Sequence, residues 1–174
     1  MIALATLGLL ALVAFQIATT RAALGKLRVA QRLIEETGGL PDPTLPPRGT
    51  RVAAFRAPLA SGPPGEITGD ALRARTVVVG FFTSGCLQCE AVCEDIEATP
   101  LGAPLIALVH AEPSDPPAAV ARIVRRLGPI AQVAYLDAEV KAAFAFRDDS
   151  GFPTLVKLHN GLVVAAGHGV AELS

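Results

Sequence analysis

VVVGFFTSGCLQC, from Val77 to Cys89, is the most informative stretch of this chain, because an apolar run ends there in two cysteines three positions apart. The run is β-branched and aromatic, which indicates a buried strand from Thr76 to Phe82. The residues that follow, from about Cys86 to Ala98, favour a helix. A cysteine delivered by a strand to the first turn of a helix lies beside unpaired backbone N–H groups, which favour its thiolate form.

The spacing of these cysteines gives each a chemical role. Cys86 is the candidate nucleophile, and Cys89, one helical turn later, can attack a mixed disulfide and release the substrate. Two other interpretations are open, namely a pair of buried small apolar residues or half of a zinc site. Zinc is disfavoured because the chain has no second CxxC motif, and because three scattered histidines are typical of solvated or core-edge positions: His110, His159 and His168. We therefore predict a redox dithiol with no metal and no cofactor.

The remaining cysteine, Cys93, follows Cys89 by one turn. We expect Cys93 to be buried as a small apolar residue and to be inert in turnover. One alternative is a copper-handling protein, because Cys89 and Cys93 form a CxxxC motif and thiolates suit Cu(I). Another alternative is a redox-inert binding module held at a membrane.

The rest of the chain continues the alternation of strands and helices. Two further buried strands are predicted at Pro104–His110 and Ile130–Asp137. Helical patterns follow them within Asp115–Gly128 and Ala138–Asp149. The dipeptide Asn160-Gly161 predicts the turn of a hairpin. Strand–helix alternation that ends in a hairpin predicts an α/β sandwich with a mixed sheet.

The N-terminal residues have a different composition. Hydrophobic residues make up 51% of the 174 residues and charged residues 18%, and much of the hydrophobic excess lies in residues 1–20. The apolar run from Ile2 to Ala18 reaches roughly 26 Å as a helix, close to the minimum for a bilayer core. Nothing basic precedes Ile2. We therefore predict a transmembrane signal anchor at residues 1–20 rather than a cleaved signal or a buried helix.

Two short segments connect this anchor to the domain. Apolar positions repeat with helical spacing in residues 21–37 and basic residues lie between them, which predicts a juxtamembrane amphipathic helix. This helix either contacts lipid together with the anchor or continues the anchor into solvent. Residues 38–50 are rich in proline and glycine and are predicted as a linker, leaving residues 51–174 for the domain. A net charge of −1 without a basic run excludes a nucleic-acid partner.

A second motif, GFPTLVKLHNGLVVAAGHG, begins at Gly151 and indicates a protein family. With the CxxC motif it resembles the thioredoxin superfamily, and nearly the whole chain resembles the membrane-anchored TlpA-like thioredoxins, most of all the methylamine-utilization accessory proteins of the MauD type. The resemblance implies a thioredoxin-like three-layer sandwich with a mixed sheet, preceded by an N-terminal transmembrane helix. It also implies a cis peptide bond between Phe152 and Pro153. The substrate-binding residues would be Phe152, Pro153 and Thr154.

The same resemblance implies an activity and a location. The chain would be a membrane-anchored thiol-disulfide oxidoreductase, a reductase or isomerase of protein disulfides in which Cys86 and Cys89 are catalytic. A membrane-embedded or soluble thiol reductant would recharge it, and its client would be an exported enzyme such as methylamine dehydrogenase. We therefore expect a single-pass cell-membrane protein with its domain outside the cytoplasm. The basic residues within 21–37 argue for the opposite orientation by the positive-inside rule.

The helix after the CxxC motif departs from the family pattern. Val92 replaces the glutamate that TlpA-type proteins carry three residues after the second cysteine, and Glu94 stands in place of the helix-kinking proline. The proton acceptor for Cys89 is therefore unassigned. The helix carries four acidic residues: Glu90, Glu94, Asp95 and Glu97. Because their field opposes a thiolate at Cys86, we expect a less acidic and more reducing dithiol.

Overall fold

The computed structural model describes residues 42–147 and 150–173, together with Gln16 and Thr20. The predicted juxtamembrane helix at 21–37 lies outside the described residues, as do nearly all of the predicted anchor at 1–20 and the first part of the linker. No helix in the described part of the chain is long and apolar enough to cross a membrane. One compact unit comprises Asp42–Ser174.

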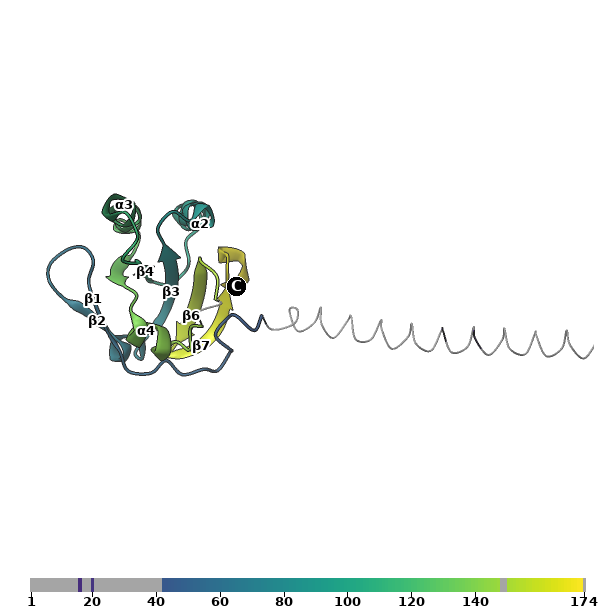
Figure 1. Ribbon diagram of the computed structural model, residues 1–174. Helices are drawn as coiled ribbons and strands as arrows, with labels where there is room; N and C mark the ends of the chain where they lie inside the picture. The colour runs from purple at the N-terminus through teal and green to yellow at the C-terminus, as the bar shows by residue number, and fades with distance from the viewer. Residues whose placement is uncertain (1–15, 17–19, 21–41, 148–149, 174) are drawn as a thin grey trace, which may run out of the picture. The chain divides into compact units, whose positions relative to one another are not determined.

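A five-stranded mixed sheet forms the centre of this unit, in the order β5-β4-β3-β6-β7 (Figure 1). Its strands are β3 (Thr76–Thr83), β4 (Leu105–His110), β5 (Gln132–Tyr135), β6 (Thr154–His159) and β7 (Leu162–Gly167). β3, β4 and β5 run parallel, whereas β6 pairs antiparallel with both β3 and β7. The mixed sheet predicted from the sequence is confirmed.

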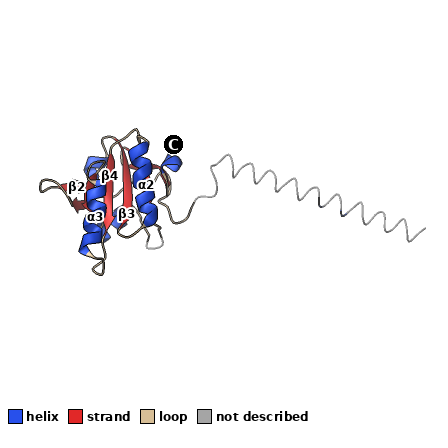
Figure 2. Cartoon of the chain, turned by 90° about the horizontal axis from the view of Figure 1, so that it is seen from above, coloured by secondary structure: helices blue, strands red, loops and turns tan. Residues whose placement is uncertain are grey.

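Helices cover both faces of the sheet. α2 (Leu87–Ala98) and α3 (Pro117–Leu127) lie side by side over one face, above β3 and β4 (Figure 2). The other face packs against α4 (Ala138–Ala143) and a small antiparallel sheet of β1 (Arg56–Pro58) and β2 (Glu66–Thr68). Alternate side chains of β3 enter the two cores, as the two-residue period of a strand requires: Val78 packs with α2 and α3, and Val79 with the opposite cluster. The result is the predicted three-layer sandwich.

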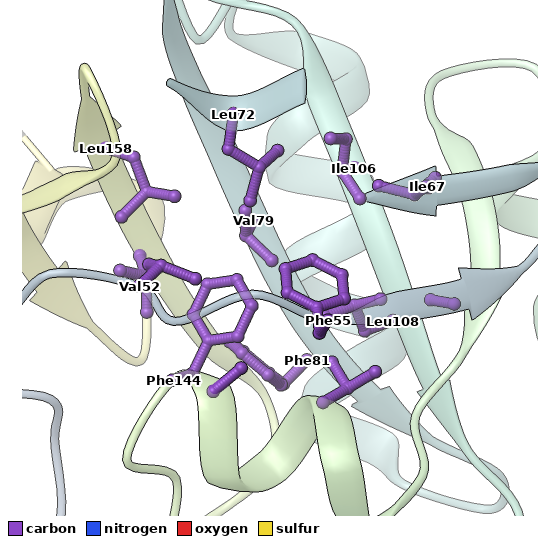
Figure 3. Packing of buried hydrophobic residues seen from close by; sticks show 14 of the residues in the cluster. Val52, Phe55, Ile67, Leu72, Val79, Phe81, Ile106, Leu108, Phe144 and Leu158 are labelled. Carbon is purple, nitrogen blue, oxygen red and sulfur yellow. The ribbon is translucent and has the colours of Figure 1, made fainter. Parts of the chain in front are cut away.

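Aromatic rings dominate the core on the α4 side (Figure 3). The ring of Phe81 meets Phe144 edge-on at a centroid distance of 5.2 Å and stacks on Phe146 at 4.5 Å. Phe55 adds a tilted contact with Phe144 at 5.5 Å. Burial of each large apolar side chain contributes about 1.5 to 3 kcal/mol, so this cluster ties α4 and the segment before β1 firmly to the sheet.

The helix predicted over Ala138–Asp149 is wrong at its C-terminal end, because α4 ends at Ala143. Phe144 and Phe146 both enter the core around Phe81, and residues two apart cannot face the same side of a continuing α-helix. Ala145 between them adopts a left-handed conformation, with φ of 52°, and turns the chain. Tertiary packing therefore overrides the local helical preference here.

The predicted hairpin turn is confirmed. Asn160 and Gly161 join β6 to β7 with positive φ values of 51° and 73°, the geometry of the tight turn for which Asn-Gly is preferred. Residues 48–50, which the sequence places in the linker, bond to β7. There the N–H of Gly49 donates to Val163 at 2.8 Å, and the N–H of Val163 donates to Thr50 at 2.9 Å. Proline and glycine exclude a helix in this segment, but they do not prevent it from bonding to a strand edge.

Candidate active site

The turn between β3 and α2 delivers Cys86 to the start of a helix. After β3 ends at Thr83, Gly85 adopts a positive φ of 69°, which glycine accepts without strain and which redirects the chain. Cys86 remains extended and is the N-cap of α2. Its Sγ accepts a hydrogen bond from the backbone N–H of Cys89 at 3.1 Å. The arrangement predicted from the sequence, a sulfur beside the free N–H groups of a first helical turn, is present.

The two cysteines of the motif differ in access to solvent. Cys86 is half-buried, whereas Cys89 is fully buried in the core beneath α2. Leu87, between them in the sequence, has 81% of its surface exposed. An incoming disulfide can therefore reach Cys86 but not Cys89, and it meets an exposed apolar side chain beside its target.

A loop from a distant part of the chain faces the Cys86 sulfur. The Phe152–Pro153 peptide bond is cis, as predicted. The carbonyl oxygen of Phe152 accepts a hydrogen bond from Cys86 Sγ at 3.5 Å. Within the described part of the chain, the backbone N–H of Phe152 donates no hydrogen bond. It is therefore free to pair with the backbone of a bound peptide.

The three predicted substrate-binding residues differ in exposure. Phe152 is half-buried, Pro153 is buried, and Thr154 is fully buried at the start of β6. The hydroxyl of Thr154 donates to the Gly151 carbonyl at 2.6 Å, which closes the loop on itself. Their role in binding substrate stays a prediction, in which Phe152 offers contact and Thr154 holds the shape of the loop.

Burial makes the thiols of Cys89 and Cys93 less acidic than an ordinary cysteine. It raises the pKa of Cys89, and the hydrogen bond with Cys86 raises it further. Burial also raises the pKa of Cys93 to about 11, although the Arg126 guanidinium offsets part of the effect. Both thiols are therefore protonated at neutral pH. The predicted burial of Cys93 is confirmed, since its side chain is fully buried.

Basic residues from α3 face the acidic side of α2. Arg126 lies 3.6 Å from a carboxylate oxygen of Glu94 and 3.3 Å from one of Glu97. Arg122 lines a groove between the two helices that begins at Cys86. The sequence predicts only the negative field of the acidic residues on α2. Because β4 pairs beside β3, α3 lies beside α2, and the positive charge of Arg126 partly balances that field.

Two histidines that the sequence treated as solvated or core-edge residues lie at this site. His110 ends β4 in register with Thr83 of β3, and its ring stacks on Phe152 at a centroid distance of 5.7 Å. His168 follows β7, and its Nδ1 lies 2.7 Å from the Pro153 carbonyl oxygen. The position of His110 could have been predicted from the sequence, because it ends a strand next to the one that leads to Cys86, and the carboxyl ends of adjacent parallel strands meet at one sheet edge. The His168 contact depends on long-range packing that no local pattern reveals.

We next consider whether side chains at the site could hold a metal ion. Among residues 42–147 and 150–173, no group of three or more His, Cys, Asp or Glu side chains is placed to hold a metal ion. His159, the third histidine, faces Thr76 and Asn160 at the far end of β6. The chemistry that the site offers is that of a nucleophilic sulfur with a second, buried thiol behind it.

No protein-family model and no curated protein sequence matches the chain, but solved structures do. The thioredoxin domain of a thiol-disulfide oxidoreductase from Bacteroides vulgatus matches with a TM-score of 0.54 at 14% identity, over 73% of this chain and 92% of that one. A thiol:disulfide interchange protein of the thioredoxin family from Chlorobium tepidum matches with a TM-score of 0.52 at 21% identity, over 72% and 92%. A DsbF homologue from Corynebacterium diphtheriae matches with a TM-score of 0.52 at 16% identity, over 68% and 76%. At these identities the similarity concerns the fold, which is thioredoxin-like.

Proposed function

We propose that this chain is a thiol-disulfide oxidoreductase that reduces or isomerises disulfides of client proteins through Cys86 and Cys89. The observation that carries the proposal is the position of the Cys86 sulfur, which accepts the Cys89 N–H at 3.1 Å and faces the Phe152 carbonyl at 3.5 Å. A half-buried sulfur at a helix N-terminus is accessible to a client disulfide, and reactive cysteines are typical of such partly exposed positions. The thioredoxin-like fold agrees with this activity.

The first step is nucleophilic attack by Cys86. Its thiolate attacks one sulfur of the client disulfide and forms a mixed disulfide with the client, while the second client sulfur leaves as a thiolate and takes up a proton. The Cys89 N–H and the α2 N-terminus favour the attacking thiolate. In isomerisation, another client cysteine then attacks the mixed disulfide and restores Cys86.

In reduction, Cys89 resolves the mixed disulfide. Its sulfur attacks Cys86 Sγ and forms a Cys86–Cys89 disulfide, and its proton passes to the departing client sulfur. Two electrons and two protons thereby move from the chain to the client. A thiol reductant, either soluble or embedded in the membrane, returns them. Because burial raises the pKa of Cys89, resolution depends on proton transfer to the leaving sulfur.

Client binding uses the surface around Cys86. The client backbone pairs with the free N–H of Phe152, and an apolar client side chain covers Leu87. The groove between α2 and α3, with Arg122 on one wall, takes the segment that continues past the client cysteine. The α2 surface and the loop before β6 together therefore present a client disulfide to one sulfur.

The proposed setting is the outer face of the cell membrane. The apolar run Ile2–Ala18 supports an anchor, and disulfides persist in oxidising compartments outside the cytoplasm. The resemblance to MauD-type proteins supports an exported, disulfide-rich client such as methylamine dehydrogenase. The basic residues within 21–37 oppose this orientation, so orientation requires its own test.

Copper handling through Cys89 and Cys93 has less support. Both side chains are fully buried, and burial raises the pKa of both thiols. Cu(I) binds thiolates, so such a site would require two buried protonated thiols to ionise. The same chain would have to open its core to admit the metal.

The test is reduction of insulin by the full chain in detergent micelles with dithiothreitol as the reductant. Cys86→Ala should lower the rate to that of dithiothreitol alone, and prereduced Cys89→Ala incubated with insulin after removal of dithiothreitol should accumulate mixed disulfides that non-reducing gels detect. Cys93→Ala is the matched control and should retain nearly full activity. Full turnover by Cys86→Ala would contradict the proposal. Stoichiometric copper bound through Cys89 and Cys93 without reductase activity would favour the copper alternative, and a dithiol that no reductant can cycle would favour a redox-inert module.

A further inference from the structure

Three successive carbonyl groups of the loop before β6 each face a different side chain. The Gly151 carbonyl accepts from Thr154 Oγ1 at 2.6 Å, the Phe152 carbonyl accepts from Cys86 Sγ at 3.5 Å, and the Pro153 carbonyl lies 2.7 Å from His168 Nδ1. Thr154 adjoins the loop, and Cys86 is the reacting group itself. Among these three partners, His168 is therefore the one that could fix the loop from outside without changing during the reaction.

The contact shows which nitrogen of the His168 ring is the donor. A carbonyl oxygen only accepts hydrogen bonds, so Nδ1 carries a proton and donates to Pro153. The other ring nitrogen, Nε2, faces Asp42, whose carboxylate oxygen lies 3.7 Å away. Hydrogen bonds from the side chain and backbone of Thr44 hold the pKa of Asp42 below its usual range, and the nearby His168 ring acts in the same direction. Asp42 is thus a carboxylate that lies near Nε2 at a distance longer than a hydrogen bond, so the bond to Pro153 is the contact that holds the ring.

Within the site, His168 contacts the loop and not the reacting sulfur. Its ring reaches the loop through Pro153, while Cys86 contacts the neighbouring residue, Phe152. No hydrogen bond joins His168 to any of the three cysteines in the described part of the chain. A change at His168 therefore leaves the hydrogen bond from the Cys89 N–H to the sulfur in place and reaches the sulfur only through the loop.

We propose that His168 is a positioning residue for disulfide exchange, which holds the Pro153 carbonyl so that Phe152 presents its free backbone N–H to the client beside Cys86. This inference rests on the proposed function and deepens it, because it assigns client affinity to a residue that touches neither the client nor the sulfur. Loss of one ordinary hydrogen bond changes an equilibrium by about fivefold, which sets the size of the expected effect.

The decisive variants differ in where they place a donor. In His168→Asn the amide nitrogen lies as many bonds from Cα as Nδ1 does, so it can still donate to Pro153, whereas in His168→Gln it lies one bond further, at the position of Nε2. His159→Ala is the matched control, because His159 lies at the other end of β6. For insulin reduction by the full chain in micelles, we expect His168→Ala and His168→Gln to raise KM about fivefold. The kcat and the rate of Cys86 alkylation by iodoacetamide should stay near wild type, and His168→Asn and His159→Ala should keep the wild-type KM.

A measurement that needs no activity accompanies the kinetics. In ¹H–¹⁵N spectra of the full chain, His168→Ala and His168→Gln should shift or broaden the amide signals of Gly151, Phe152 and Thr154, and His168→Asn should leave them near their wild-type positions. If the wild-type chain reduces no disulfide, the proposed function fails while these signals still decide whether His168 positions the loop. A wild-type KM and unchanged loop signals in His168→Ala would overturn the inference, as would equal behaviour of the Asn and Gln variants.

Discussion

At the residue scale, three side chains of one type have three different environments. Cys86 is half-buried with a backbone N–H on its sulfur, Cys89 is buried directly behind it, and Cys93 is buried one turn further along α2. Their order of reactivity follows from access and hydrogen bonding rather than from residue type. The spacing predicts that the three cysteines share one face of the helix, and burial of Cys93 on that face is confirmed, whereas the order of reactivity stays a prediction.

The buried thiols make the stability of the reduced protein depend on alkaline pH. Burial raises the pKa of Cys93 from an ordinary value of 9.0 to about 11, so the folded state keeps this proton after the unfolded state has released it. The contribution to stability is fully present below pH 9 and is lost as the pH rises toward 11. The free energy of unfolding should therefore fall over this window by up to about 1.4 kcal/mol per pH unit for this one group.

Cys93→Ala isolates this contribution, because every other titratable group is common to both proteins. Urea unfolding under reducing conditions between pH 8 and pH 11 should show a shallower decline for Cys93→Ala than for the wild type. Equally steep declines would mean that Cys93 ionises as easily in the fold as in the unfolded chain.

At the scale of elements, sequence patterns identified those that depend on local chemistry. β3, α2 and the β6–β7 hairpin are close to their predicted positions, because β-branched runs, helix-start geometry and the Asn160-Gly161 turn act within a few residues. The β1–β2 pair and the early end of α4 were not predicted, since both depend on contacts between residues far apart in sequence. The role of His168 was missed for the same reason, because Pro153 reaches it only after β6 and β7 have paired.

The N-terminus of α4 offers a test of a local element that supports the core. Asp137 is the N-cap, and its carboxylate accepts the backbone N–H of Val140 at 2.9 Å. Asp137→Ala should lower the free energy of unfolding by about 1 kcal/mol. Asp137→Asn keeps the acceptor and should lower it by only about a few tenths of a kcal/mol. Urea unfolding at neutral pH measures both variants. A loss in Asn as large as that in Ala would show that the charge, and not the hydrogen bond, stabilises this helix.

At the scale of the whole molecule, the site is assembled from ends of elements that are distant in sequence. The β3–α2 turn supplies Cys86, the end of β4 supplies His110, the loop before β6 supplies Phe152, and the residue after β7 supplies His168. Each lies where a strand begins or ends, so the rigid sheet sets their relative positions. Asp42, the first residue of the compact unit, also contacts this assembly through His168.

The orientation of the chain in the membrane is the remaining test at this scale, and two properties of the sequence oppose each other. Disulfide exchange on exported clients requires the domain outside the cytoplasm, whereas the basic residues Arg21, Lys26, Arg28 and Arg32 favour a cytoplasmic flank. We expect alkaline phosphatase fused after Ser174 to be active in intact bacteria, because this enzyme needs an oxidising compartment to form its disulfides. A fluorescent protein fused at the same position should stay dark. Replacing the four basic residues with glutamine should raise the exported fraction further, since it removes the charges that resist translocation. An inactive phosphatase with a bright fluorescent fusion would place the dithiol in the reducing cytoplasm, and the proposed exported clients would then be excluded.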